Sequence, residues 1–237
     1  MILLGLGVGA GLGFGAARTS SADVRCLSPG GDPPGILAAG VYTTRCFLPG
    51  MRVMIPAGGW AGAEDSPVEF KLLPPNSPSE DTPALRFWID PHAAPACSTR
   101  FLPVDVSTPT KMVGWLKANK NLIITEPRRT TIAGHIPALM VDLDTATNAP
   151  RCDPSCPGPC MGYFIFRAPG ITPTDTYGTG RGEPVRLYFA QIGPPTHLFA
   201  VNVDTPNKHV FATMNVIAAK MLATLRLPSK LPSPRGR

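Results

Sequence analysis

Short apolar runs bounded by proline, glycine or asparagine recur along the chain from about residue 40 onward. Runs of this length between turn-forming residues are typical of β-strands. Their short connections favour antiparallel pairing, because a parallel return needs a dozen or more residues. We therefore predict strands at residues 41–47, 51–55, 68–73, 84–89, 121–125, 130–133, 137–143, 162–167, 185–192 and 197–204.

Two segments repeat their apolar residues at helical spacing instead. In residues 108–118, Thr108 can cap a helix and Pro109 suits its first turn. In residues 206–225 the apolar residues follow alternating steps of three and four, and Thr205 can act as the cap. The pattern predicts an α+β fold: an antiparallel sheet of short strands with two packed helices, the second of them a C-terminal amphipathic helix.

The two ends of the chain differ from this central part. The first seventeen residues carry no charge, which suits the apolar segment of a signal peptide better than a full membrane span. Ser20, Ser21 and Ala22 then offer a cleavage site of small residues. We expect a signal peptide or signal anchor at 1–22, a proline- and glycine-rich linker at 23–39, one α+β domain at 40–228 and a disordered basic tail at 229–237.

The formal net charge of +6 overstates the charge of the predicted domain, because Lys230, Arg235 and Arg237 lie in the last eight residues. No stretch interleaves basic and aromatic residues in the way that nucleic-acid-binding surfaces do. We therefore expect no nucleic-acid partner. We do expect the N-terminal segment to contact a membrane, and the chain to be a monomer.

An even number of cysteines after an export-like segment indicates an oxidising compartment. We predict up to three disulfides among Cys26, Cys46, Cys97, Cys152, Cys156 and Cys160. The preferred bridge joins Cys156 to Cys160, which leaves Cys152 for a distant partner such as Cys97. The alternative is a metal or redox site formed by the thiols of residues 152–160. Prolines throughout this segment rule out a helix that would align them, so we expect no bound metal and no cofactor.

Sequence motifs of catalysis are missing from the chain. It contains neither G-x-S-x-G nor S-x-x-K, and no pair of histidines has the spacing of a zinc motif. The adjacent pairs Glu64–Asp65 and Glu80–Asp81 are interpreted as solvated loop charges that cannot flank one bond. We predict a non-catalytic protein; the alternative is a secreted hydrolase whose triad comes from distant loops.

The clearest candidate for recognition is the glycine-rich segment Tyr177–Gly182, which is interpreted as a hairpin tip able to hold an anion. Tyr177 and Arg181 are the candidate contacts there. Trp60 follows two glycines in a predicted turn, which makes a partly exposed ring a third candidate.

Several short motifs together resemble a group of uncharacterised exported bacterial proteins. They comprise an A-G-x-Y-x-T opening at 39–44, a G-W turn at 59–60, a V-x-W-L helix at 113–116 and a C-P-x-P-C loop at 156–160. The chain departs from the group's V-G-G turn at 132–134, where the first glycine is Ala133. The resemblance implies export and a single domain but no activity. The order of elements is also similar to the PsbP-like α/β/α sandwich, at the level of the fold alone.

These observations indicate where the protein is located better than they indicate an activity. We expect an exported, disulfide-stabilised domain, either extracellular or anchored to the membrane and facing outward. It would bind an envelope partner or a small ligand through its loops.

Overall fold

The computed structural model describes residues 35–77, 83–94, 97, 103–152, 158–165, 176–194 and 196–231. Within this part of the chain, two α-helices and several antiparallel sheets form an α+β fold, as predicted from the sequence. The described residues include no helix that is long and apolar enough to cross a membrane.

The largest sheet of the described residues has nine strands, all paired antiparallel. Its strands are β1 (Gly35–Ile36), β4 (Ala61–Asp65), β5 (Glu69–Leu73), β6 (Ala84–Ile89), β8 (Leu122–Ile124), β9 (Arg128–Ile132), β10 (Ile136–Thr145), β13 (Val185–Ile192) and β14 (His197–Asp204). They follow the order β1-β4-β5-β6-β14-β13-β10-β8, and β9 also pairs with β10. Strands β6, β14 and β13 lie at the centre and are buried on both faces.

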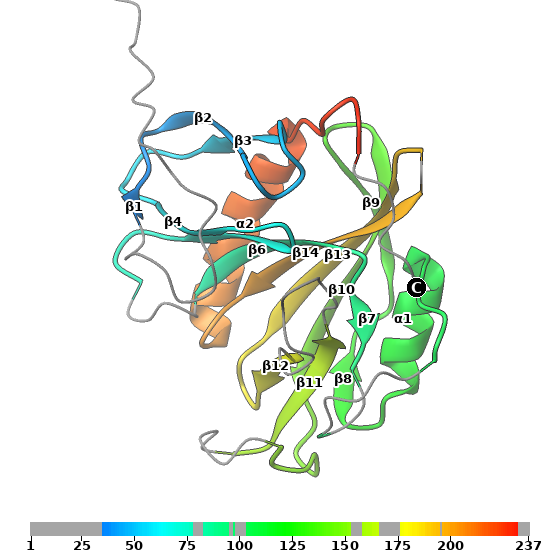
Figure 1. The fold of residues 1–237 in the computed structure, drawn as a ribbon. Coiled ribbons are helices and arrows are strands. Elements are labelled where there is room, and N and C mark those ends of the chain that lie inside the picture. Colours follow the sequence, from blue (N-terminus) through cyan, green and yellow to red (C-terminus); the bar gives the residue numbers. More distant parts are fainter. Residues whose placement is uncertain are drawn as a thin grey trace, which may run out of the picture.

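One face of this sheet is covered by helix α2 (Lys208–Thr224) and by a hairpin of β2 (Gly40–Thr43) and β3 (Arg52–Ile55) (Figure 1). The core on this side contains the rings of Phe70, Phe87 and Phe199, which pack against one another in a tilted arrangement. Because side chains alternate along a strand, Leu85 and Phe87 of β6 face this core.

The other face is covered by helix α1 (Pro109–Ala118) and by a smaller sheet of β7 (His92–Ala93), β11 (Cys160–Ile165) and β12 (Thr176–Gly180), in the order β12-β11-β7. Trp88 of β6 packs here against Phe164 of β11. Arg86 lies two residues before Trp88 and therefore on the same face of β6. It is a buried charged side chain in an otherwise apolar strand. The small sheet therefore covers a charge in the interior.

Both predicted helices are present, and one of the two predicted caps is wrong. Thr108 caps α1, accepting a hydrogen bond from the Lys111 N–H at 3.2 Å. Helix α2 is capped by Asn207 rather than by Thr205. The Thr205 side chain is buried and donates its hydroxyl to the Pro184 carbonyl at 2.8 Å, so it is not free to cap.

Three other expectations about local structure are corrected. The predicted linker would end at residue 39, yet Gly35 and Ile36 already pair with β4. Residues 44–47 belong to a turn instead of a strand, because the buried Asp65 accepts hydrogen bonds from the N–H groups of residues 45–47. Strand β12 occupies most of the segment predicted to be a hairpin tip. Residues 1–34 and the tail from 232 onward lie outside the described part.

Candidate functional site

The site is a cluster of ionic and polar side chains between the central sheet and the small sheet. Arg86 is at its centre, and the side chain is only 4% exposed. Its Nη1 donates to Glu69 Oε1 of β5 at 3.0 Å, and its Nε lies 3.9 Å from Asp204 Oδ2 of β14. Because a buried charge without partners is costly, these two carboxylates are what make the buried guanidinium tolerable.

Tyr177 of β12 covers the cluster from the opposite layer. The Arg86 Cζ lies 4.4 Å from the centre of the Tyr177 ring, within the range of a cation–π interaction. The Tyr177 hydroxyl donates to Asp204 Oδ2 at 2.9 Å. Burial raises the pKa of Tyr177 well above its usual range, so the phenol keeps its proton. This predicted contact residue therefore joins the two sheets.

The inner end of the cluster contains polar groups without a regular hydrogen bond. Tyr163 of β11 and Asn202 of β14 are both fully buried. Neither the Tyr163 hydroxyl nor the Asn202 amide makes a hydrogen bond of normal geometry within the described residues. Burial raises the pKa of Tyr163 well above its usual range, so its hydroxyl remains a donor. These groups are therefore buried at a cost that no regular hydrogen bond within the described residues offsets.

The outer end of the cluster is Glu64 of β4. Burial, followed by the charge of the neighbouring Glu69, raises the pKa of Glu64 to about 7. Glu64 is thus the carboxyl of this site that can exchange a proton near neutral pH. Its neighbour Asp65 is buried on the other face and holds the turn at residues 45–47. The two side chains do point to opposite faces, as expected, but neither is a solvated loop charge.

The N–H groups of the Tyr177–Gly182 segment, expected to hold an external anion, bind carboxylates of the protein itself. The Gly180 N–H donates to Glu183 Oε2 at 2.8 Å, and the Gly182 N–H donates to Asp144 Oδ1 at 3.0 Å. Gly178 is required for close packing, because a Cβ there would lie 2.3 Å from the Met161 carbonyl oxygen. Arg181 follows β12 in an exposed turn. Arg181 is therefore the candidate that remains available for contact.

Trp60 does not have the partial exposure predicted for it. Its side chain is 1% exposed and belongs to the core beneath helix α2. The three predicted contact residues therefore do not form one site. Trp60 lies in the core, Tyr177 lies between the two sheets, and Arg181 lies in an exposed turn.

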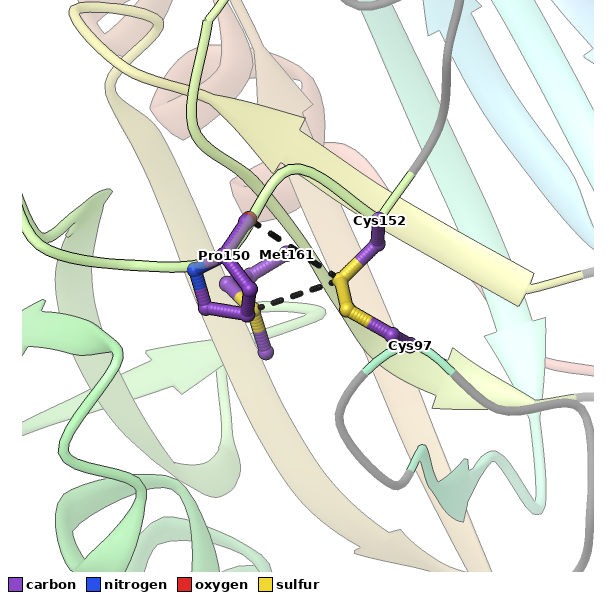
Figure 2. The surroundings of a disulfide bond; sticks show 4 residues. All are labelled: Cys97, Pro150, Cys152 and Met161. Atoms are coloured by element: carbon purple, nitrogen blue, oxygen red, sulfur yellow. Dashed lines mark hydrogen bonds between the residues drawn. A yellow bond between two sulfur atoms is a disulfide. The ribbon is translucent and has the colours of Figure 1, made fainter.

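A disulfide joins Cys97 to Cys152 across 55 residues, as predicted for Cys152 (Figure 2). Its Cys152 Sγ lies 3.7 Å from Met161 Sδ and 4.0 Å from the Pro150 carbonyl oxygen. Cys46 is also disulfide-bonded, and the described residues do not contain its partner. Cys26 and Cys156 lie outside the described residues.

Cys160 is a buried free thiol, so the predicted Cys156–Cys160 bridge is wrong. A β-bridge pairs Cys160 with Arg151, which places Met161 beside Cys152. Because neighbouring residues of a strand point to opposite faces, the Cys160 thiol points away from the disulfide. With Cys152 oxidised, the three-thiol metal alternative is also wrong. The described residues contain no group of three His, Cys, Asp or Glu side chains that could hold a metal ion.

One histidine forms a carboxylate pair away from the cluster. His197 is buried at the start of β14, and its Nδ1 lies 2.6 Å from Asp90 Oδ2. Asp90 Oδ1 also accepts the Leu198 N–H at 2.9 Å, which fixes the carboxylate. His135 instead contacts the Ala133 carbonyl oxygen. An oriented Asp–His pair is one part of a catalytic triad.

Sequence reasoning did not find the ionic cluster. The available signal was Arg86 in the middle of the apolar run at 84–89, where a charge on a buried strand requires buried partners. Comparisons with known proteins assign no family: no family model matches the chain, and no curated protein is significantly similar to it.

Proposed function

We propose that this protein is an exported, non-catalytic domain of the cell envelope that is stabilised by disulfides and binds a partner or ligand through its loops. The observation that carries the proposal is the Cys97–Cys152 disulfide. Disulfides between distant segments persist in oxidising compartments and are rare where glutathione and thioredoxin keep thiols reduced. The uncharged N-terminal segment supports the same location.

Export is tested by expressing the full chain in a bacterial host and fractionating the cells. We expect the protein outside the cytoplasmic fraction, with the peptides of Cys97 and Cys152 joined before reduction. Cys160 should react with an alkylating reagent only after unfolding, because its thiol is buried. Recovery in the cytoplasmic fraction, with Cys97 and Cys152 both open to alkylation, would contradict the proposal.

Contact through loops rests on the turn that presents Arg181. Hydrogen bonds from the N–H groups on both sides of Arg181 to Asp144 and Glu183 fix this turn. The Arg181 N–H itself donates to the Pro159 carbonyl at 3.0 Å. A fixed turn loses little conformational entropy when its exposed guanidinium meets an acidic group.

Photocrosslinking in intact cells tests this contact. A benzoylphenylalanine at position 181 should form a discrete adduct, and the same probe at the exposed position 129 on β9 should not. Equal adducts at both positions, or none at either, would argue against this turn as the contact.

A secreted hydrolase is the second candidate, and the Asp90–His197 pair favours it. The pair would orient a base toward a serine in a complete triad. A fluorophosphonate probe should then label one serine in the wild type but not in a His197→Gln variant. Absence of labelling in the folded wild-type protein would remove this candidate.

A further inference from the structure

The outward face of the β2–β3 hairpin exposes apolar side chains. Val41 and Met54 are paired across the two strands, and they are 49% and 41% exposed. Val53 and Ile55, which alternate with Met54 along β3, are buried against the core beneath the hairpin. The hairpin therefore buries its inner face and leaves an apolar pair on its outer face.

Two arginines extend this outer face. Arg52 is exposed and shares the outward side of β3 with Met54. Arg226 pairs with Arg52 through two backbone hydrogen bonds of 2.8 and 2.9 Å, and its side chain is also exposed. Side chains of directly opposed residues lie on the same side of a sheet, and like charges placed so are destabilising. Neither arginine forms an ion pair within the described part of the chain.

Both ends of the described part of the chain lie close to this face, and the N-terminal end follows the segment that we expect to enter a membrane. The uncharged residues 1–17 precede β1, which is followed at once by β2, and Ile36 of β1 is 80% exposed. Residues 18–34 reach at most about 60 Å when fully extended. At the other end, the segment after α2 runs past the hairpin, with Pro228 beside Gly50, and continues to the exposed Lys230.

We propose that the hairpin patch, defined as Val41, Arg52, Met54 and Arg226, binds the anionic headgroups of a phospholipid bilayer. Apolar side chains flanked by arginines are the combination that suits the boundary between headgroups and acyl chains. Lipid phosphates would neutralise the opposed arginine pair, while Val41 and Met54 enter the interface. The inference rests on the expectation, shared with the proposed function, that the N-terminal segment enters a membrane.

Oxidation of Met54 by hydrogen peroxide reports contact at the patch in the full chain. The protein is reconstituted into phosphatidylcholine vesicles with or without about a third phosphatidylglycerol. We expect Met54 to oxidise at least about threefold more slowly on the anionic vesicles than on the phosphatidylcholine vesicles, because the anionic bilayer shields its sulfur. Met140 of β10 lies outside the patch and serves as the internal reference.

Paired variants test the role of the arginines. R52Q/R226Q should remove the protection of Met54, whereas R52K/R226K should keep most of it and become more sensitive to salt. The exposed Arg129→Gln on β9 is the matched control and should behave as the wild type. All of these chains retain residues 1–17 and should sediment with both kinds of vesicle.

The results separate this inference from the proposed function. Equal oxidation of Met54 on both kinds of vesicle, in protein that sediments with them, would overturn the patch and leave export intact. Protection that survives in R52Q/R226Q would likewise overturn it. Shielding of Met54 by an acidic protein in cell membranes, but not by anionic vesicles, would identify a protein partner instead of the bilayer.

Discussion

Glu64 shows how one half-buried carboxyl makes stability depend on pH. Its pKa is raised to about 7 in the folded protein, whereas an unfolded chain has the ordinary value of about 4.5. Between these values the folded state holds a proton that the unfolded state has released. The contribution of Glu64 is therefore fully present below about pH 4.5 and is lost as the pH rises through about 7.

We expect Glu64→Gln to remove this dependence. As the pH rises from 4.5 to 7.5, the free energy of unfolding of the variant should increase by about 2 kcal/mol relative to that of the wild type. This value is smaller than the full pKa difference implies, because solvent partly screens the half-buried carboxyl. Urea unfolding at a series of pH values measures the difference. Glu126→Gln is the matched control: it removes an exposed carboxylate that pairs with Lys117 and should cost less than about 1 kcal/mol. A difference between Glu64→Gln and the wild type that does not change with pH would disprove the raised pKa of Glu64.

Arg86 tests the energetics of the buried cluster. Replacing it with methionine keeps an unbranched side chain but leaves the carboxylates of Glu69 and Asp204 buried without a cation. We expect the free energy of unfolding to fall by about 3 to 5 kcal/mol, which is the typical cost of removing one partner of a buried ion pair.

Thermal and urea unfolding measure the Arg86→Met variant against Lys117→Met. Lys117 forms an exposed ion pair with Glu126, and removing it should cost less than about 1 kcal/mol. Equal losses in the two variants would show that the cluster is open to water and screened.

At the level of the elements, helix α2 depends on Asn207. Its Oδ1 accepts the N–H groups of His209 and Val210 at 3.0 and 3.1 Å. We expect Asn207→Ala to cost about 1 kcal/mol and Asn207→Asp to restore most of it, because aspartate is an equally good cap. Hydrogen exchange at the amides of residues 209 and 210 should accelerate in the alanine variant.

Thr205 provides the contrast for this prediction. A Thr205→Val variant loses the buried hydrogen bond to Pro184 but leaves the cap in place. Its amides at 209 and 210 should therefore exchange as in the wild type. Faster exchange at residues 209 and 210 in this variant would show that Thr205, not Asn207, caps the helix.

The elements that could be predicted are those whose side chains carry a strong pattern. Strands β13 and β14 occupy their predicted ranges because they are rich in apolar residues that pack on both faces. Strands β4 and β12 were missed, since Ala61–Asp65 and Thr176–Gly180 contain small and polar residues that favour turns. Their pairing comes from neighbouring strands, which no local pattern reveals.

The candidate site was lost for the same reason. Glu69, Arg86 and Asp204 lie on strands that are adjacent in the sheet but far apart in sequence. Tyr177 reaches them from a strand in another layer, and its neighbours are glycines typical of a turn. The pairing register within the central sheet and the packing of the small sheet against it bring these four side chains together, so residue type alone could suggest the buried charge but not its partners.

For the molecule as a whole, the Cys97–Cys152 disulfide ties the end of the β6–β7 region to the chain before β11. It lies at the edge of the small sheet that covers the ionic cluster. Closing a loop of 55 residues lowers the entropy of the unfolded chain, which by the chain-entropy relation stabilises the fold by about 4 kcal/mol.

A C97A/C152A double variant should therefore lose about 2 to 4 kcal/mol in free energy of unfolding, with the disulfide of Cys46 kept intact by non-reducing buffer. Cys160→Ala is the matched control: it removes a buried thiol without opening a loop and should cost only about 1 kcal/mol. If the loss comes from the unfolded chain, spectra of the folded double variant should match the wild type and unfolding should remain a single transition. A separate early transition of the small sheet would mean that the disulfide holds two layers together in the folded state. The ionic cluster beneath would then become open to water before the central sheet unfolds.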